Sequence, residues 1–275
     1  MDAIRFGALF KASWTNGIAA IVSRPLISLI VFTLTFSTTL WSTEVAEVIR
    51  AAKVTGAAVV PKYYLREFGA AIGAVLGMVM LSVQVMRYAT FGEDNSAGIS
   101  YLRGVWRNWW LTWIFAFASV FGGIIAFVVP FLLMRLTSLT HGGVLMWLVI
   151  GVPLFIVVIA LDAFALIRLE MLYCSRAIGE RLSISGAWQL TRGRFWTIFL
   201  LHFVVGIPIY AAKILHYFFY HILLSVLSHA NLLLETATVG AITTMLATAV
   251  WSACVASLYR EFVAHAKVAS QDIVY

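Results

Sequence analysis

The chain has 275 residues, of which 62% are hydrophobic and only 11% are charged. A soluble domain carries about 25% charged residues, so this composition excludes a water-soluble globular protein. The formal net charge of +7 is also found in nucleic-acid-binding proteins, but no recognition motif accompanies it here, so we expect no nucleic acid among the partners.

Apolar runs recur along the chain, each near the roughly 20 residues that a membrane-spanning helix requires. Unbroken runs of this length predict helices rather than the alternating strands of a membrane barrel. The predicted fold is therefore all-α: a polytopic membrane helical bundle in a single integral membrane domain. Its six transmembrane helices are predicted at about 20–41, 68–88, 109–133, 144–171, 195–212 and 236–258.

The distribution of Lys and Arg predicts the orientation of these spans. Thirteen of the 19 basic residues fall in the N-terminus, the C-terminus and the connections on the same side of the membrane, and the other six fall on the opposite side. Because basic residues concentrate on the cytoplasmic side, both termini are predicted to be cytoplasmic. The expected location is the bacterial cytoplasmic (inner) membrane.

The first two segments in chain order are predicted to lie at the membrane surface. Ala3, Phe6, Phe10 and Trp14 share one helical face, which predicts an interface helix before the first span. Residues 45–52 form an apolar face between the first two spans, and we interpret them as an outside surface helix, with a docking surface for a partner as the alternative.

The second span carries a helix-packing motif. Gly69, Gly73 and Gly77 follow one another at four-residue spacing in "FGAAIGAVLG". Such a ridge has no side chains and lets another helix approach to backbone contact. We favour a partner helix within the chain over one in a second copy.

Two basic, aromatic segments precede the third and fifth spans. They read "ISYLRGVWRNWWLTWIF" at 99–115 and "ISGAWQLTRGRFWTIF" at 184–199. Ser183 or Ser185 is predicted to cap a short helix that stops at Gly193. Trp is enriched at membrane interfaces and Arg binds lipid phosphate, so each segment predicts an interface helix that binds anionic phospholipid headgroups. The residues expected to contact the lipid headgroup are Arg103, Arg107, Arg192, Arg194, Trp106 and Trp188.

The same segments resemble those of known membrane proteins. "ERLSISGAWQLTRGRFWTIFLL" is similar to the loop-to-helix segment of uncharacterised six-span inner-membrane proteins of bacteria, the YciC-like family, and of the membrane domain of some glycerophosphodiester phosphodiesterases. "MRYATFGEDNSAGISYLRGVWRNWW" resembles the segment after the second span in alphaproteobacterial proteins of unassigned role. The resemblance implies a bacterial membrane bundle and transfers no catalytic residue, because those phosphodiesterases carry their active site on a separate soluble barrel.

Asp162 is predicted to be the only acid inside a span. A carboxylate there must face the bundle interior, be protonated or find a cation, and Arg87 and Arg168 are the candidate partners. We interpret Asp162 as part of a buried structural salt bridge or as a residue near the membrane boundary, with a proton or ion site of a transporter as the alternative. Farther along, residues 214–234 are predicted to rest in the outside interface, and Pro130 and Pro208 to mark helix breaks near the outer ends.

No pattern in the chain indicates catalysis. The sequence lacks HExxH, GxSxG and Walker motifs, and its histidines do not assemble into a ligand set. Cys174 and Cys254 are expected to stay unpaired. We therefore expect no enzyme, no cofactor and no metal. The predicted function is a non-catalytic inner-membrane component, an accessory subunit or a lipid- or envelope-organising factor. Its expected partners are membrane phospholipids and, as a second candidate, a protein partner in a membrane complex. A transporter or channel for a small solute or lipid is the alternative function.

Overall fold

Helices make up the computed structural model, which describes residues 6–56, 61–92, 99–137, 149, 152–223 and 229–271. In chain order they are α1 (Phe6–Ser23), α2 (Pro25–Thr55), α3 (Pro61–Phe91), α4 (Ile99–Thr137), α6 (Val152–Ile178), α7 (Ile184–Leu190), α8 (Phe195–Leu223) and α9 (His229–Gln271). Among the described residues, five stretches are long and apolar enough to cross a membrane: Pro25–Ala52, Tyr63–Phe91, Val152–Ile178, Phe195–Phe219 and Leu233–Val263. The predicted all-α class is confirmed, and these five helices have the character of a multi-pass membrane protein.

The remaining predicted span, 109–133, falls within α4. The backbone of α4 is helical from Ile99 to Thr137, but many side chains in its second half lie outside the described residues. The number of six transmembrane helices therefore stays a prediction.

Pro25 separates α1 from α2. A proline has no N–H with which to bond the carbonyl four residues before it, here that of Ile21. The hydroxyl of Ser28 donates to that carbonyl instead, at 2.8 Å, so the break leaves no orphaned acceptor. The first span therefore begins at Pro25 and not at residue 20 as predicted, because an apolar run does not reveal a kink within it.

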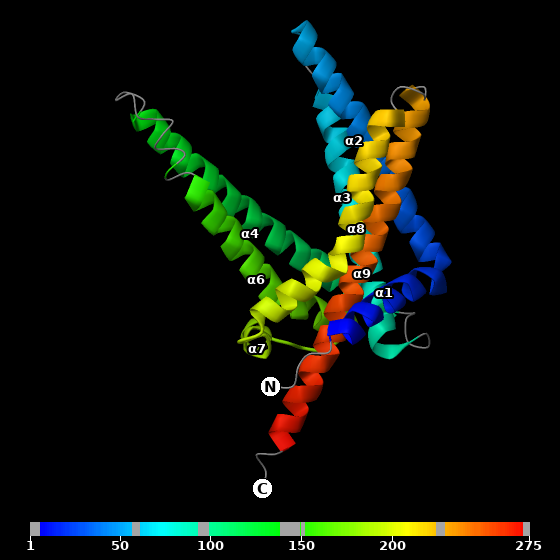
Figure 1. Cartoon of the computed structure of the whole chain (residues 1–275), viewed down its shortest axis with the longest axis vertical. Coiled ribbons are helices and arrows are strands. Elements are labelled where there is room, and N and C mark those ends of the chain that lie inside the picture. Colours follow the sequence, from blue (N-terminus) through cyan, green and yellow to red (C-terminus); the bar gives the residue numbers. More distant parts are fainter. Residues whose placement is uncertain are drawn as a thin grey trace.

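Two segments predicted to lie outside the membrane continue the spans next to them. Residues 45–52 belong to α2, which continues to Thr55. Gly56 caps the helix at a positive φ of 71°, and its N–H bonds the carbonyl of Ala52. Residues 214–223 extend α8, and 224–228 lie outside the described residues. Pro208 lies inside α8, which bends along its length in Figure 1, as expected when a proline removes a helix hydrogen bond.

Two of the three predicted interface helices, α1 and α7, are separate elements, and the third is part of a longer helix. Residues 99–110 are the first turns of α4 and run without a break into the apolar stretch. The first predicted helix lies in α1, which packs on α9 and buries Leu9, Ser13, Gly17 and Ala20. Phe10 and Trp14 of the predicted face are partly buried against the same core, so this face adjoins the buried one. Residues 184–190 do form a short helix, α7, and Ser183 caps it as predicted by accepting a hydrogen bond from the Gly186 N–H at 3.0 Å.

The helices converge at one end of the molecule and diverge at the other (Figure 1). The helices α2, α3, α8 and α9 stand together, and α1 crosses the lower end of this group. The antiparallel pair α4 and α6 leans away from them, and α7 lies at its base. The start of α1 and the end of α9 lie at the lower end.

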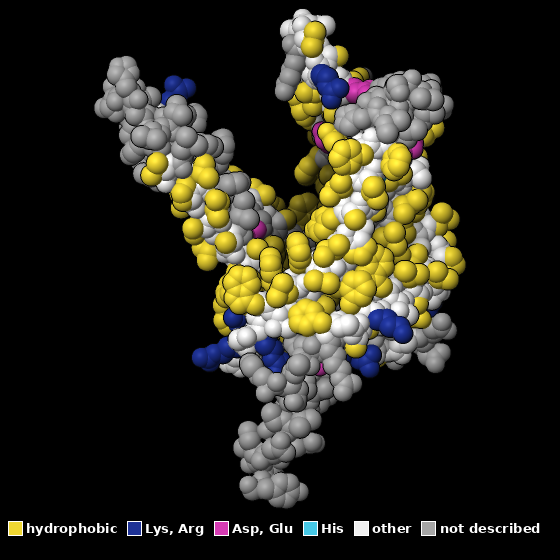
Figure 2. Space-filling model, in the orientation of Figure 1, with side chains coloured by type: hydrophobic (Ala, Val, Ile, Leu, Met, Phe, Trp, Pro, Cys, Tyr) yellow, Lys and Arg dark blue, Asp and Glu magenta, His cyan; other side chains and the backbone are white. Residues whose placement is uncertain are grey.

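Buried hydrophobic side chains gather at the lower end, where the helices meet. They come from the stretches 79–89 of α3, 101–111 of α4, 171–177 of α6, 198–209 of α8 and 247–262 of α9. Above this core, apolar side chains of α4 and α6 such as Phe117 and Leu161 are exposed. A crevice with an apolar surface therefore opens between the α4–α6 pair and α8 (Figure 2).

Polar side chains join the helices inside the bundle. Gln84 of α3 donates to the Ala20 carbonyl of α1 at 2.6 Å, and Asn108 of α4 donates to the Tyr173 carbonyl of α6 at 3.1 Å. Bonds of this kind contribute about 0.6 kcal/mol each in a membrane bundle and fix which faces meet.

The predicted glycine ridge on α3 faces α2. A Cβ added at Gly77 would lie 3.4 Å from Leu34 and one at Gly73 would lie 3.7 Å from it, whereas Gly69 has no atom within 4 Å. Closer approaches between helices occur at two other described glycines. A Cβ at Gly17 would lie 3.1 Å from the Cα of Val250, and one at Gly104 would lie 3.1 Å from the carbonyl oxygen of Ala177.

Candidate functional site

Basic side chains gather at the lower end of the molecule, around α7 and the helix ends beside it (Figure 2). Two elements supply the predicted headgroup arginines: Arg103 and Arg107 lie in the first turns of α4, and Arg192 and Arg194 lie in the turn between α7 and α8. The turn follows α7 directly and contains Gly193 at a φ of 75°. Two segments far apart in sequence thus place their arginines at the same end of the bundle.

Exposed indole rings accompany these arginines. Trp106 of α4 is 59% exposed, Trp188 of α7 is 41% exposed and Trp196 of α8 is 70% exposed. Such rings are suited to the boundary between headgroups and hydrocarbon, because one edge can donate a hydrogen bond while the rest is apolar.

The four arginines differ in what they contact within the protein. Arg103 and Arg192 are exposed and Arg107 is half-buried. None of their three guanidinium groups has a hydrogen bond or ion pair in the part of the chain that the structure describes. The guanidinium of Arg194 instead lies 4.6 Å above the ring of Phe262 in α9. Three of the four predicted residues are therefore available to an external anion, and the fourth holds α8 and α9 together.

Three acids lie close to these arginines in the sequence: Glu93, Asp94 and Glu180. Glu180 accepts a hydrogen bond from the hydroxyl of Tyr259, which ties the connection after α6 to α9. Glu93 and Asp94 lie outside the described residues.

Arg168 and Arg87, the predicted partners of Asp162, are bound to backbone carbonyls. Arg168 donates to the Trp188 carbonyl at 3.2 Å, and its guanidinium lies 4.9 Å from the ring of Phe164 and 5.0 Å from that of Trp188. This arrangement attaches α7 to α6 and fixes the orientation of Trp188.

Arg87 of α3 donates to the Ala177 carbonyl of α6 at 3.2 Å and to the hydroxyl of Ser100 at 3.0 Å. Asp162 is half-buried in α6, six residues before Arg168. Its pairing with either arginine stays a prediction.

The structure shows a second acid inside α6, and the sequence reading missed it. Glu170 lies within the apolar stretch Val152–Ile178, so Asp162 is not the only acid in a span as predicted. The Glu170 carboxylate lies 3.2 Å from Nε2 of His202 in α8, and both side chains are more than four-fifths buried. The pair was missed because Glu170 falls at the edge of the predicted run and its partner is 32 residues away.

A cavity of about 490 Å³ lies beside this pair, between α6, α8 and α9. His202, Tyr210 and Trp251 supply the polar side chains of its wall, and the other lining residues are apolar: Ala163, Leu166, Ile167, Phe199 and Phe203. The volume is within the range of about 300–1,000 Å³ of small-molecule sites. Asp162 does not line it.

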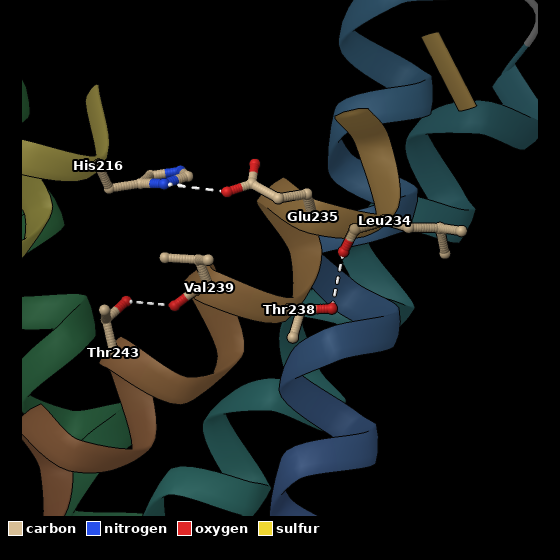
Figure 3. A network of polar contacts seen from close by, with 6 residues as sticks. All are labelled: His216, Leu234, Glu235, Thr238, Val239 and Thr243. Carbon is tan, nitrogen blue, oxygen red and sulfur yellow. Dashed lines mark hydrogen bonds and ion pairs between the residues drawn. The ribbon is translucent and has the colours of Figure 1, made fainter. Parts of the chain in front are cut away.

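A pair of the same type joins α8 to α9 near the opposite end of α8. Nδ1 of His216 lies 3.3 Å from the carboxylate of Glu235, and Figure 3 shows the two side chains reaching toward each other between the helices. The neighbouring hydroxyls of Thr238 and Thr243 donate to the carbonyls of Leu234 and Val239 in their own helix and not to the carboxylate of Glu235.

Cys174 and Cys254 are both buried and unpaired. Among the described residues, no group of three or more His, Cys, Asp or Glu side chains is placed to hold a metal ion.

Comparisons of the chain with protein-family models, with curated proteins and with solved structures found no match. The resemblance to YciC-like proteins therefore stays an expectation, and the functional argument depends on the geometry of this chain.

Proposed function

We propose that this protein is a non-catalytic component of the bacterial inner membrane whose lower, cytoplasmic end binds anionic phospholipid headgroups. Its role would be that of an accessory subunit or a lipid- or envelope-organising factor. The observation that carries the proposal is the set of Arg103, Arg107 and Arg192, which have no described protein partner and lie at the same end as the exposed rings of Trp106 and Trp196.

The charge distribution supports the assignment of this end to the cytoplasm. Basic residues favour the cytoplasmic side of a membrane protein, and that leaflet carries the anionic lipids. Each Lys or Arg near such a surface contributes about 1 kcal/mol of attraction, so three arginines would contribute about 3 kcal/mol.

Lipid-dependent thermal stability tests this proposal. We expect phosphatidylglycerol added to the detergent-purified protein to raise its melting temperature, and phosphatidylcholine to have little effect. Replacing Arg103, Arg107 and Arg192 together by Gln should remove most of the difference between the two lipids.

Single substitutions provide a matched control for this experiment. Arg192→Gln should reduce the response to phosphatidylglycerol, whereas Arg50→Gln, an exposed arginine near the end of α2 at the other end of the bundle, should not. A triple variant that still responds as the wild type does would contradict the headgroup site.

A transporter for a small solute or lipid is the second candidate function, and the Glu170–His202 pair favours it. Ionisable pairs inside membrane bundles often mark ion or proton pathways. Movement of a solute or of protons across proteoliposomes, lost in Glu170→Gln, would place this function first.

A further inference from the structure

Glu170 of α6 and His202 of α8 contact each other between the two helices, and His202 lines the 490 Å³ cavity. Both side chains are more than four-fifths buried within the bundle. Ionisable groups at such a position are costly, and removing the charge or sharing a proton lowers that cost. The hydrogen bonds of the imidazole determine how the proton is held.

One ring nitrogen of His202 is fixed by its own helix. Nδ1 lies 2.8 Å from the carbonyl oxygen of Ile198. A carbonyl oxygen only accepts hydrogen bonds, so Nδ1 must carry a hydrogen in this arrangement.

The other ring nitrogen faces the carboxyl group. Nε2 lies 3.2 Å from a carboxyl oxygen of Glu170, a distance that makes an ion-pair contact but without the alignment of a hydrogen bond. With Nδ1 protonated, a small rotation of either side chain would let Nε2 donate N–H to a carboxylate or accept O–H from a carboxylic acid, and both forms contain one proton between the two groups. Moving this proton from nitrogen to oxygen turns imidazolium and carboxylate into imidazole and carboxylic acid. The pair is neutral in both forms. One added proton would make it +1, and one lost proton would make it −1.

The other oxygen of Glu170, Oε1, is buried and has no hydrogen-bond partner. The titratable group facing the pair from α9 is the thiol of Cys254, which lies next to Ser13 of α1. On α6 itself, the nearest basic group is Arg168, which is bound to the Trp188 carbonyl. No described cation therefore competes with His202 for the carboxyl group.

We propose that Glu170 and His202 form a proton-binding site within the bundle, which holds one proton as a unit and links α6 to α8. The ligand class is the proton, and the site requires neither a metal nor a cofactor. The inference is independent of the headgroup proposal, because it involves none of the surface arginines.

Nitrogen NMR of the protein labelled with ¹⁵N-histidine and reconstituted in lipid nanodiscs tests the proposal directly. The signals of His202 are identified by their loss in His202→Gln. At neutral pH we expect Nδ1 to be protonated and Nε2 to be bonded to a shared proton. In Glu170→Gln the carboxamide should donate N–H to Nε2, so Nε2 should shift to the position of an unprotonated acceptor while Nδ1 stays protonated.

The pair of His216 and Glu235 supplies the control for this measurement. Glu235→Gln should change the signals of His216 and leave those of His202 unchanged. An unprotonated Nδ1 of His202 in the wild type, or a Nε2 signal unaffected by Glu170→Gln, would overturn the proposal.

A double-mutant cycle tests the link between the helices. Glu170→Leu and His202→Leu should each lower the melting temperature, because each leaves a buried polar partner alone. The double variant should melt above both single variants. Additive losses in the cycle would show that the two residues do not act as a unit and would also overturn the proposal.

Discussion

A methyl group added at Gly17 should force α1 away from α9. The new Cβ would lie 3.1 Å from the Cα of Val250 and 3.2 Å from the carbonyl carbon and oxygen of Ala249. These are backbone atoms of α9, so they cannot turn aside as the end of a flexible side chain can. Gly69 provides the control, because it also lies inside a helix and a Cβ there would meet no atom within 4 Å.

The expected magnitude comes from the difference between these two positions. Replacing Gly by Ala inside a helix stabilises it by about 0.8–1.0 kcal/mol, and this gain applies to both. Overpacking of a tight contact costs about 1–3 kcal/mol and applies only at Gly17. We therefore expect Gly69→Ala to be stabilising and Gly17→Ala to be about 1–3 kcal/mol less stable than Gly69→Ala. Gly73→Ala should behave like Gly69→Ala, since its nearest atom is a Leu34 methyl at 3.7 Å.

Unfolding by sodium dodecyl sulfate in mixed micelles, followed by far-UV circular dichroism, measures these free energies. Gly17→Val should lose more stability than Gly17→Ala, because its two extra methyl groups face the same backbone. If Gly17→Ala proved as stable as Gly69→Ala, then α1 and α9 would not be in backbone contact, and the packing of α1 inside the bundle would be wrong.

Two further predictions concern α7 and the orientation of the spans. Ser183→Ala removes the acceptor for the Gly186 N–H and should destabilise α7 by about 1 kcal/mol. The loss should appear as faster amide hydrogen exchange in residues 184–190, and unchanged exchange would show that the cap does not stabilise the helix. A reporter active only outside the cytoplasm should be active when fused after residue 55, 139 or 230 and silent when fused after residue 98 or 182. The reverse pattern would refute the cytoplasmic assignment of the lower end.

The sequence alone determined the class of the protein and most of its helices. Apolar runs of spanning length can be recognised without tertiary contacts, because the membrane requires every backbone polar group to be bonded within the helix. The cap at Ser183 was also predictable, since a capping hydroxyl bonds an N–H only three residues away. These features depend on local chemistry.

The boundaries and the pairing of helices depended on the tertiary structure. No local signal separates the first turns of α4 from its apolar stretch, or shows that Gly17, rather than Gly69, lies against another backbone. The identity of the buried acid is a further example, because Glu170 is 32 residues from His202 and only the meeting of α6 and α8 brings them to 3.2 Å. The hydropathy of one segment specifies that it is buried in the membrane. It does not specify which helix lies beside it, because lipid and helix surfaces are equally apolar and small residues and polar contacts select the partner.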